Sequence, residues 1–276
     1  MIRFWFIAVT LALATSALPA QDWAKILVEK SPRHLEWVKV KHGAREVGCY
    51  VGYPEIPDKA TAVLVIHDIW GMSHWARATV DDFAAAGYIA IAPDLLWGAG
   101  AKGGGTSEVE SDQVTQKVSL LSPDQVTADL NAAAAYVAKL PACNGKVVVV
   151  GFCWGGSQTF RFATNNQDLK AAFVFYGDGP TEATELARIR CPVVGFYAAN
   201  DARINATIPK SIEQMKAAGK IYEPIFYEGS GHGFMKSGMA PPPPADAEEK
   251  ARAAYHANQK ARQESWDRLT KALKKI

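Results

Sequence analysis

The stretch VVVVGFCWGG, from Val147 to Gly156, decides how this chain folds. Its β-branched residues predict a buried strand, and the glycines on either side of Cys153 predict a bend too tight for a Cβ. Such a bend pushes the middle side chain out of the edge of a sheet. Cys153 is therefore either an exposed nucleophile or a small buried residue, and the surrounding sequence is needed to distinguish the two.

On both sides of this stretch, predicted strands alternate with predicted helices. A hairpin precedes buried strands at TAVLVIHD, GYIAIAPD, AAFVFYGD, CPVVGFYAAND and IYEPIFYEG. This alternation predicts an α/β fold with a mostly parallel central sheet and helices on both faces. The predicted helices lie near residues 74–86, 122–140, 157–164, 181–187, 207–218 and 245–273.

The first twenty residues, MIRFWFIAVTLALATSALPA, have the layout of a secretory signal peptide. Arg3 precedes an apolar run, and small residues lead to a predicted cleavage site after Ala20. An uncleaved membrane anchor is the alternative, but threonine, serine and proline interrupt the roughly 20 apolar residues that a span needs. We expect a signal peptide at 1–20, a single domain with a C-terminal helix at 21–276, and a secreted or periplasmic protein without stable membrane insertion.

Composition and motif spacing exclude several classes of function. The 276 residues carry a formal charge of +2, which gives no electrostatic argument for nucleic acid binding. The histidines lack the spacing of metal ligands, so no metal is expected. Residues 98–103 match a dinucleotide-binding glycine pattern, but no helix is predicted to start inside it; a mobile loop and no cofactor are expected.

The four cysteines are predicted to form no disulfide. Cys143 and Cys191 precede strands that we expect to be separated by another strand, so about 10 Å would lie between them. That distance is beyond the reach of a disulfide. Cys49 lies in an early strand.

Polar residues follow several predicted strands, at the edge where open parallel sheets bind ligands. Three of them, Cys153, Asp201 and His232, occur in the order nucleophile, acid, base that α/β-hydrolases use. The imidazole would take the thiol proton, and the carboxylate would fix its tautomer. Asp178 follows the preceding strand and remains an alternative acid. The full set is Asp68, Asp94, Cys153, Asp178, Asp201 and His232.

An oxyanion hole is predicted from two backbone N–H groups. One belongs to the residue after the nucleophile, Trp154, and the other follows the strand that ends in Asp68, at Ile69. Donors at these positions would stabilise the negative charge that develops on a substrate carbonyl oxygen.

The motifs GFCWGG, AAND and GSGHGF resemble those of the dienelactone hydrolase family, which consists of cysteine-dependent α/β-hydrolases. VLVIHDIWGMSHWARATVDDFAAAGYIAIAPDLLWG is similar to the first conserved segment of that family, and the resemblance runs from about Thr61 to Trp266. It implies an α/β-hydrolase fold, no cofactor, and hydrolysis of lactones or small esters through a thioester.

Two departures from the family pattern bear on the substrate. Asp68 stands where family members usually carry a glutamate that contacts the resting thiol, and it is one methylene shorter. The best-known members also bind a substrate carboxylate with two arginines. Here the loop after Asp94 reads LLWGAG, and Lys236 occupies the position four residues after His232. Because lysine cannot bind a carboxylate bidentately, neutral substrates are expected.

Aromatic residues past the strand ends are candidates for an apolar substrate pocket. Trp70, Trp97 and Phe234 are predicted to line it together with Lys236. Tryptophans at such positions often serve packing alone, and that reading remains open. Two alternatives to a hydrolase also remain, a non-catalytic binding protein and a thiol-redox protein on the same scaffold.

Overall fold

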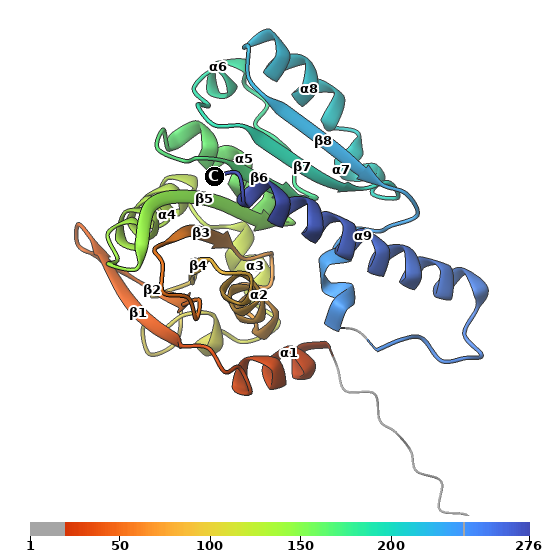
Figure 1. The fold of residues 1–276 in the computed structure, drawn as a ribbon, viewed down its shortest axis with the longest axis horizontal. Coiled ribbons are helices and arrows are strands. Elements are labelled where there is room, and N and C mark those ends of the chain that lie inside the picture. Colours follow the sequence, from red (N-terminus) through yellow and green to blue (C-terminus); the bar gives the residue numbers. More distant parts are fainter. Residues whose placement is uncertain (1–19, 240) are drawn as a thin grey trace, which may run out of the picture.

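A computed structural model describes residues 20–239 and 241–276 as one eight-stranded sheet flanked by helices (Figure 1). The strand order is β1-β2-β4-β3-β5-β6-β7-β8, with β1 and β2 antiparallel to their neighbours and the others parallel. This confirms the predicted mostly parallel α/β architecture. The strands are β1 (Leu35–His42), β2 (Arg45–Gly52), β3 (Ala60–Ile66), β4 (Ile89–Pro93), β5 (Cys143–Phe152), β6 (Ala172–Phe175), β7 (Val193–Ala198) and β8 (Tyr222–Tyr227).

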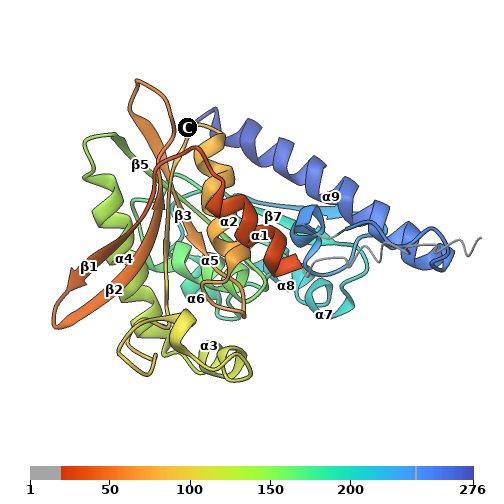
Figure 2. The same ribbon diagram turned by 90° about the horizontal axis from the view of Figure 1, so that it is seen from below.

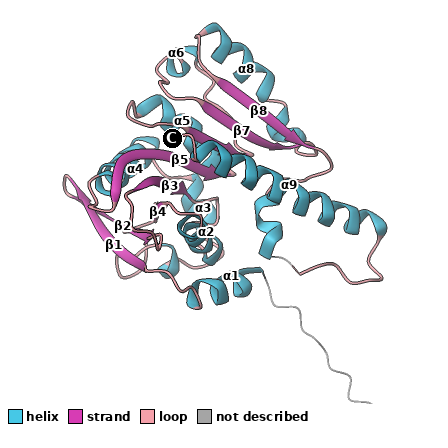
Figure 3. Ribbon diagram, in the orientation of Figure 1, coloured by secondary structure: helices cyan, strands magenta, loops and turns pink. Residues whose placement is uncertain are grey.

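Helices cover both faces of the sheet (Figures 2 and 3). α4, α5 and α8 contribute to the apolar layer on one face, and α1, α2 and α9 to the layer on the other. The helices are α1 (Ala20–Glu29), α2 (His74–Ala85), α3 (Val114–Ser119), α4 (Pro123–Ala138), α5 (Trp154–Asn165), α6 (Ala183–Leu186), α7 (Ala202–Asn205), α8 (Ile208–Ala217) and α9 (Glu249–Leu273), with 3₁₀ turns η1 (Thr106–Glu108) and η2 (Phe234–Met239).

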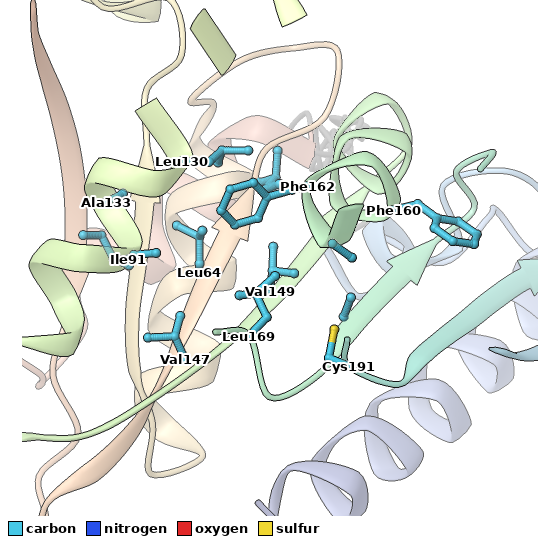
Figure 4. Packing of buried hydrophobic residues seen from close by; sticks show 14 of the residues in the cluster. Leu64, Ile91, Leu130, Ala133, Val147, Val149, Phe160, Phe162, Leu169 and Cys191 are labelled. Carbon is cyan, nitrogen blue, oxygen red and sulfur yellow. The ribbon is translucent and has the colours of Figure 1, made fainter. Parts of the chain in front are cut away.

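The central strand β5 is buried on both sides, which explains its run of valines. Val147 and Val149 pack in one apolar layer, whereas Val148 and Val150 pack in the other. The two layers therefore fix the register of β5 and the position of Cys153, which follows it. Figure 4 shows part of the first layer, with Leu64, Ile91, Leu130, Ala133, Val147, Val149, Phe160, Phe162, Leu169 and Cys191.

The glycine-rich loop at 98–105 is held by its own hydrogen bonds, whereas the sequence suggested a mobile segment. The N–H groups of Gly98 and Gly100 both donate to the Gly104 carbonyl, at 3.0 Å each. The Glu108 carboxylate accepts two further N–H groups of the loop, also at 3.0 Å. These hydrogen bonds define the conformation of the loop in the structure, and its mobility stays a prediction.

All four cysteines are free thiols in the structure. Cys143 begins β5 and Cys191 precedes β7, and β6 lies between these strands. Burial raises the pKa of Cys191 to about 11 and that of Cys49 further still. Both thiols are therefore poor nucleophiles at neutral pH.

The predicted signal peptide lies outside the described residues, apart from Ala20, where α1 begins. Across residues 20–239 and 241–276, no helix is long and apolar enough to cross a membrane. The same residues contain no group of three or more histidine, cysteine, aspartate or glutamate side chains placed to hold a metal ion.

Candidate active site

Cys153 occupies a strained bend between β5 and α5. Its φ angle is +58°, in the region that usually requires glycine. A Cβ on Gly151 would lie 2.2 Å from the Gly155 carbonyl oxygen, and one on Gly155 would lie 2.2 Å from that of His67. Glycine is therefore required on both sides of the bend, because backbone packs directly against backbone there. This close packing holds the thiol at the carboxyl edge of the sheet.

The structure brings His232 into contact with both other members of the predicted triad. Its Nδ1 lies 2.5 Å from Asp201 Oδ2, and the ring lies next to the Cys153 thiol, which interacts with it. The hydrogen bond with Cys153 raises the pKa of His232, burial opposes the rise, and the bond with Asp201 adds to it. The imidazole is therefore poised to accept and hold the thiol proton.

Asp201 is positioned by the start of α7. Its other oxygen, Oδ1, accepts the N–H of Ile204 at 3.3 Å and caps this helix. The carboxyl side chain is almost fully buried beside the imidazole. The cap fixes one oxygen and leaves the second for His232.

The alternative acid, Asp178, has a different partner. Its carboxylate accepts a short hydrogen bond from the Ser157 hydroxyl, and its N–H donates to Ser157 Oγ at 3.2 Å. Asp178 therefore anchors the loop after β6 to α5, and the structure pairs His232 with Asp201 instead.

Asp68 contacts a lysine. Its carboxyl group is buried and forms an ion pair with Lys236. Asp68 Oδ1 also accepts the Trp70 N–H at 2.9 Å, and Lys236 Nζ lies 5.1 Å from the centre of the Trp75 ring. Each carboxylate oxygen thus has a partner of its own. The sequence placed Asp68 and Lys236 near the site, and the structure pairs them.

Two backbone N–H groups are available for an oxyanion. Within the described parts of the chain, neither the Ile69 nor the Trp154 N–H has a hydrogen-bond partner. Trp154 begins α5, where N–H groups have no acceptor inside the helix. Ile69 lies in a turn closed by the Gly71 N–H, which donates to the Asp68 carbonyl at 3.1 Å. These are the two donors that the sequence suggested.

Tyr176, which the sequence did not single out, lies next to these groups. Cys153 and Tyr176 (φ +40°) are the non-glycine residues of the described chain with positive φ. The Tyr176 ring is buried and lies edge-on to His232, with centroids 4.9 Å apart. Burial raises the pKa of its hydroxyl, the charges of Asp68 and Cys153 add to the rise, and the Met235 backbone lowers it. Only its place at the end of β6 could have indicated it.

The predicted aromatic pocket residues fall into three environments. Trp70 is 51% exposed and offers an apolar surface. Trp97 packs over Gly48 of β2, where a Cβ would lie 2.3 Å from its ring, and its centroid lies 6.0 Å from that of Trp37. Phe234 is 1% exposed, so its side chain fills the core and offers no surface to a substrate, unlike the prediction. Packing alone accounts for its position.

Comparisons with known proteins agree with this geometry. Residues 47–276 match the model of the dienelactone hydrolase family. Proteins named "Putative carboxymethylenebutenolidase" are similar: that of Yersinia pestis is 31% identical over 77% of this chain and 79% of its own, and that of Methylorubrum extorquens is 30% identical over 71% of each. The crystal structure of a "Putative Dienelactone Hydrolase" from Klebsiella pneumoniae superposes with a TM-score of 0.72 at 24% identity, covering 88% of this chain and 99% of its own. The chain has the α/β-hydrolase fold and belongs to the dienelactone hydrolase family of hydrolases.

Proposed function

We propose that this protein is an exported thiol hydrolase of small, neutral esters or lactones. Cys153 is the nucleophile, His232 the general base and Asp201 the acid that orients it. One observation carries the proposal: His232 lies beside the Cys153 thiol, and its Nδ1 is 2.5 Å from Asp201 Oδ2. A thiol, an imidazole and a buried carboxylate in this chain of contacts are the components of nucleophilic acyl transfer.

The reaction follows from these contacts. Because Nδ1 faces Asp201, Nε2 of His232 takes the proton of the Cys153 thiol. The sulfur then attacks the carbonyl carbon, and the N–H groups of Ile69 and Trp154 bind the resulting oxyanion. His232 returns the proton to the departing alkoxide, which leaves a thioester. Water, deprotonated by the same imidazole, attacks the thioester, releases the acid and restores the thiol.

The ion pair of Asp68 with Lys236 argues for neutral substrates. The lysine charge is already neutralised by a buried carboxylate, so an anionic substrate would have to compete with Asp68 for it. The related carboxymethylenebutenolidases are named for a lactone that carries a carboxymethylene group. For this chain we propose neutral esters or lactones, with the exposed Trp70 as an apolar contact.

Export is proposed from the pattern of the first twenty residues. If the signal peptide is removed after Ala20, the mature protein begins at Gln21. Expression with the natural N-terminus, cell fractionation and N-terminal sequencing test this. A protein that stays in the cytosol refutes export, and an exported protein that retains Met1 refutes cleavage; neither result affects the proposed chemistry.

The chemistry is tested with a panel of nitrophenyl esters and lactones on wild type and Cys153→Ala. We expect the substitution to lower turnover by roughly three to six orders of magnitude, as removal of a nucleophile does. Cys191→Ala is the matched control, because that thiol is buried away from the site, and it should stay within a few-fold of wild type. Iodoacetamide should label Cys153 selectively. Full turnover by Cys153→Ala would refute the assignment.

A further inference from the structure

His67 is a fully buried imidazole at the end of β3 that the proposed reaction does not use. Its Nδ1 lies 2.8 Å from the Asp68 carbonyl oxygen, and the Leu95 N–H donates to its Nε2 at 3.4 Å. Since Nε2 accepts, Nδ1 must carry the proton and donate. A single neutral tautomer therefore satisfies both contacts.

The carbonyl that His67 binds belongs to the same peptide unit as the Ile69 N–H. In a trans peptide the C=O and the N–H point in opposite directions. A donor fixed on the Asp68 oxygen therefore turns the Ile69 N–H away from the imidazole ring. The hydrogen bond also polarises the peptide unit, which makes its N–H a better donor.

The same imidazole contacts the other predicted oxyanion donor. Its ring stacks on the indole of Trp154, with centroids 5.7 Å apart and planes 15° apart. The backbones meet as well, because a Cβ on Gly155 would lie 2.2 Å from the His67 carbonyl oxygen. His67 thus touches the peptide of Ile69 by a hydrogen bond and Trp154 by its ring face.

We infer that His67 is a positioning residue that sets the direction and spacing of the Ile69 and Trp154 N–H groups. Those donors then bind the oxyanion that develops on the carbonyl oxygen of an ester or lactone when Cys153 attacks it. The inference rests on the proposed function, and it assigns to a buried side chain a role in the acylation step. A histidine that serves packing alone would affect stability and every property of the site together.

Three substitutions separate these roles. His67→Asn keeps an N–H donor near the place of Nδ1. His67→Gln moves the donor to the place of Nε2, and His67→Phe keeps a ring for stacking without any donor. Acylation by a neutral nitrophenyl ester, kcat and KM are measured beside the rate of Cys153 alkylation by iodoacetamide. Alkylation needs the thiolate and His232 but no oxyanion donors.

We expect His67→Phe to slow acylation by about 10- to 100-fold, somewhat less than the loss of a whole oxyanion donor. KM should change by less than about threefold, because the donors act in the transition state. His67→Asn should recover most of the rate and His67→Gln should not. The alkylation rate and its pH profile should match wild type in all three variants.

Two outcomes overturn the inference: wild-type acylation by His67→Phe, or alkylation and acylation that fall together. If His67→Phe fails to fold, equal acylation rates in the Asn and Gln variants also overturn it. Failure of the proposed function looks different, because Cys153→Ala would then keep wild-type turnover, and this result overturns both ideas.

Discussion

Asp201 and Asp94 are both buried carboxylates just past the ends of parallel strands, yet they have different kinds of partner. One oxygen of Asp201 accepts a hydrogen bond at the start of α7, and the other is hydrogen-bonded to His232. Both oxygens of Asp94 accept hydrogen bonds from residues that flank the glycine-rich loop. Its Oδ1 accepts the Leu96 N–H and the Thr106 hydroxyl, and its Oδ2 accepts the Thr106 N–H.

In the proposed reaction, a carboxylate at the edge of the sheet is therefore not sufficient to act as the acid of the triad. It must keep one oxygen free of the backbone so that a titratable side chain can bind it. Asp94 holds a loop, whereas Asp201 can orient a base. The largest difference in activity is therefore expected between variants in which the charge of each carboxylate is removed in turn.

Asp201→Asn should lower kcat by on the order of 10³- to 10⁴-fold, because an amide holds the imidazole in the wrong tautomer. Steady-state kinetics with a neutral nitrophenyl ester measure the loss. Asp94→Asn is the control and should stay within about tenfold of wild type by the same argument. If Asp94→Asn or Asp178→Asn loses as much activity as Asp201→Asn, the comparison fails.

Asp94→Ala should instead act on stability. The substitution leaves the buried Leu96 N–H and the part-buried N–H and hydroxyl of Thr106 without their acceptor, and an unpaired buried polar group costs about 1–3 kcal/mol. The melting temperature should fall by several degrees. Limited proteolysis should then cut within 98–105 faster than in wild type. An unchanged melting temperature and intact loop would show that Asp94 does not hold it.

Asp68 lies between these cases, because one oxygen binds the Trp70 N–H and the other pairs with Lys236. Lys236→Arg would place a planar, multidentate cation there, able to bind Asp68 and a substrate carboxylate together. We expect kcat/KM for a carboxylate-bearing lactone to rise by about tenfold relative to a neutral aryl ester. Lys236→Gln, without a charge, is the control. A wild type that already prefers the anionic lactone contradicts the proposed selectivity.

The smallest expected effect concerns pH. The pKa of His232 is raised in the folded state by its bond with Cys153, so the protonated ring stabilises the fold. This stability is fully present below the ordinary value of about 6.5 and is lost as pH rises through the raised folded value. Urea unfolding should therefore show a larger difference between wild type and His232→Gln at pH 6 than at pH 9. A difference that stays constant with pH would contradict the raised pKa.

Much of this arrangement could be predicted from sequence because its determinants are local. GFCWGG and GSGHGF carry their own glycines, and Asp201 directly follows a buried strand. The predicted helix at 122–140 likewise begins at its proline, Pro123. The alternation of strands and helices likewise predicts the mostly parallel sheet.

What could not be predicted depends on tertiary contacts. Lys236 meets Asp68 only because η2 folds back over the end of β3. The burial of Phe234 follows from the same turn, which packs it among other aromatic rings. α1 was also missed, since its residues follow directly on the apolar segment assigned to the signal peptide. The contacts of Lys236 with Asp68 and of Phe234 with Phe175 join segments far apart in the sequence, which no local pattern records.

The direct backbone packing around Gly151 and Gly155 has a consequence for the evolution of this fold. Cys153 is held by main-chain atoms that every sequence possesses, not by the shapes of particular side chains. Core residues such as Val149 or Phe160 can therefore be exchanged for others of similar volume without displacing Cys153. Selection has only to retain a few glycines at the bend, and the remaining core is free to diverge while the thiol keeps its place.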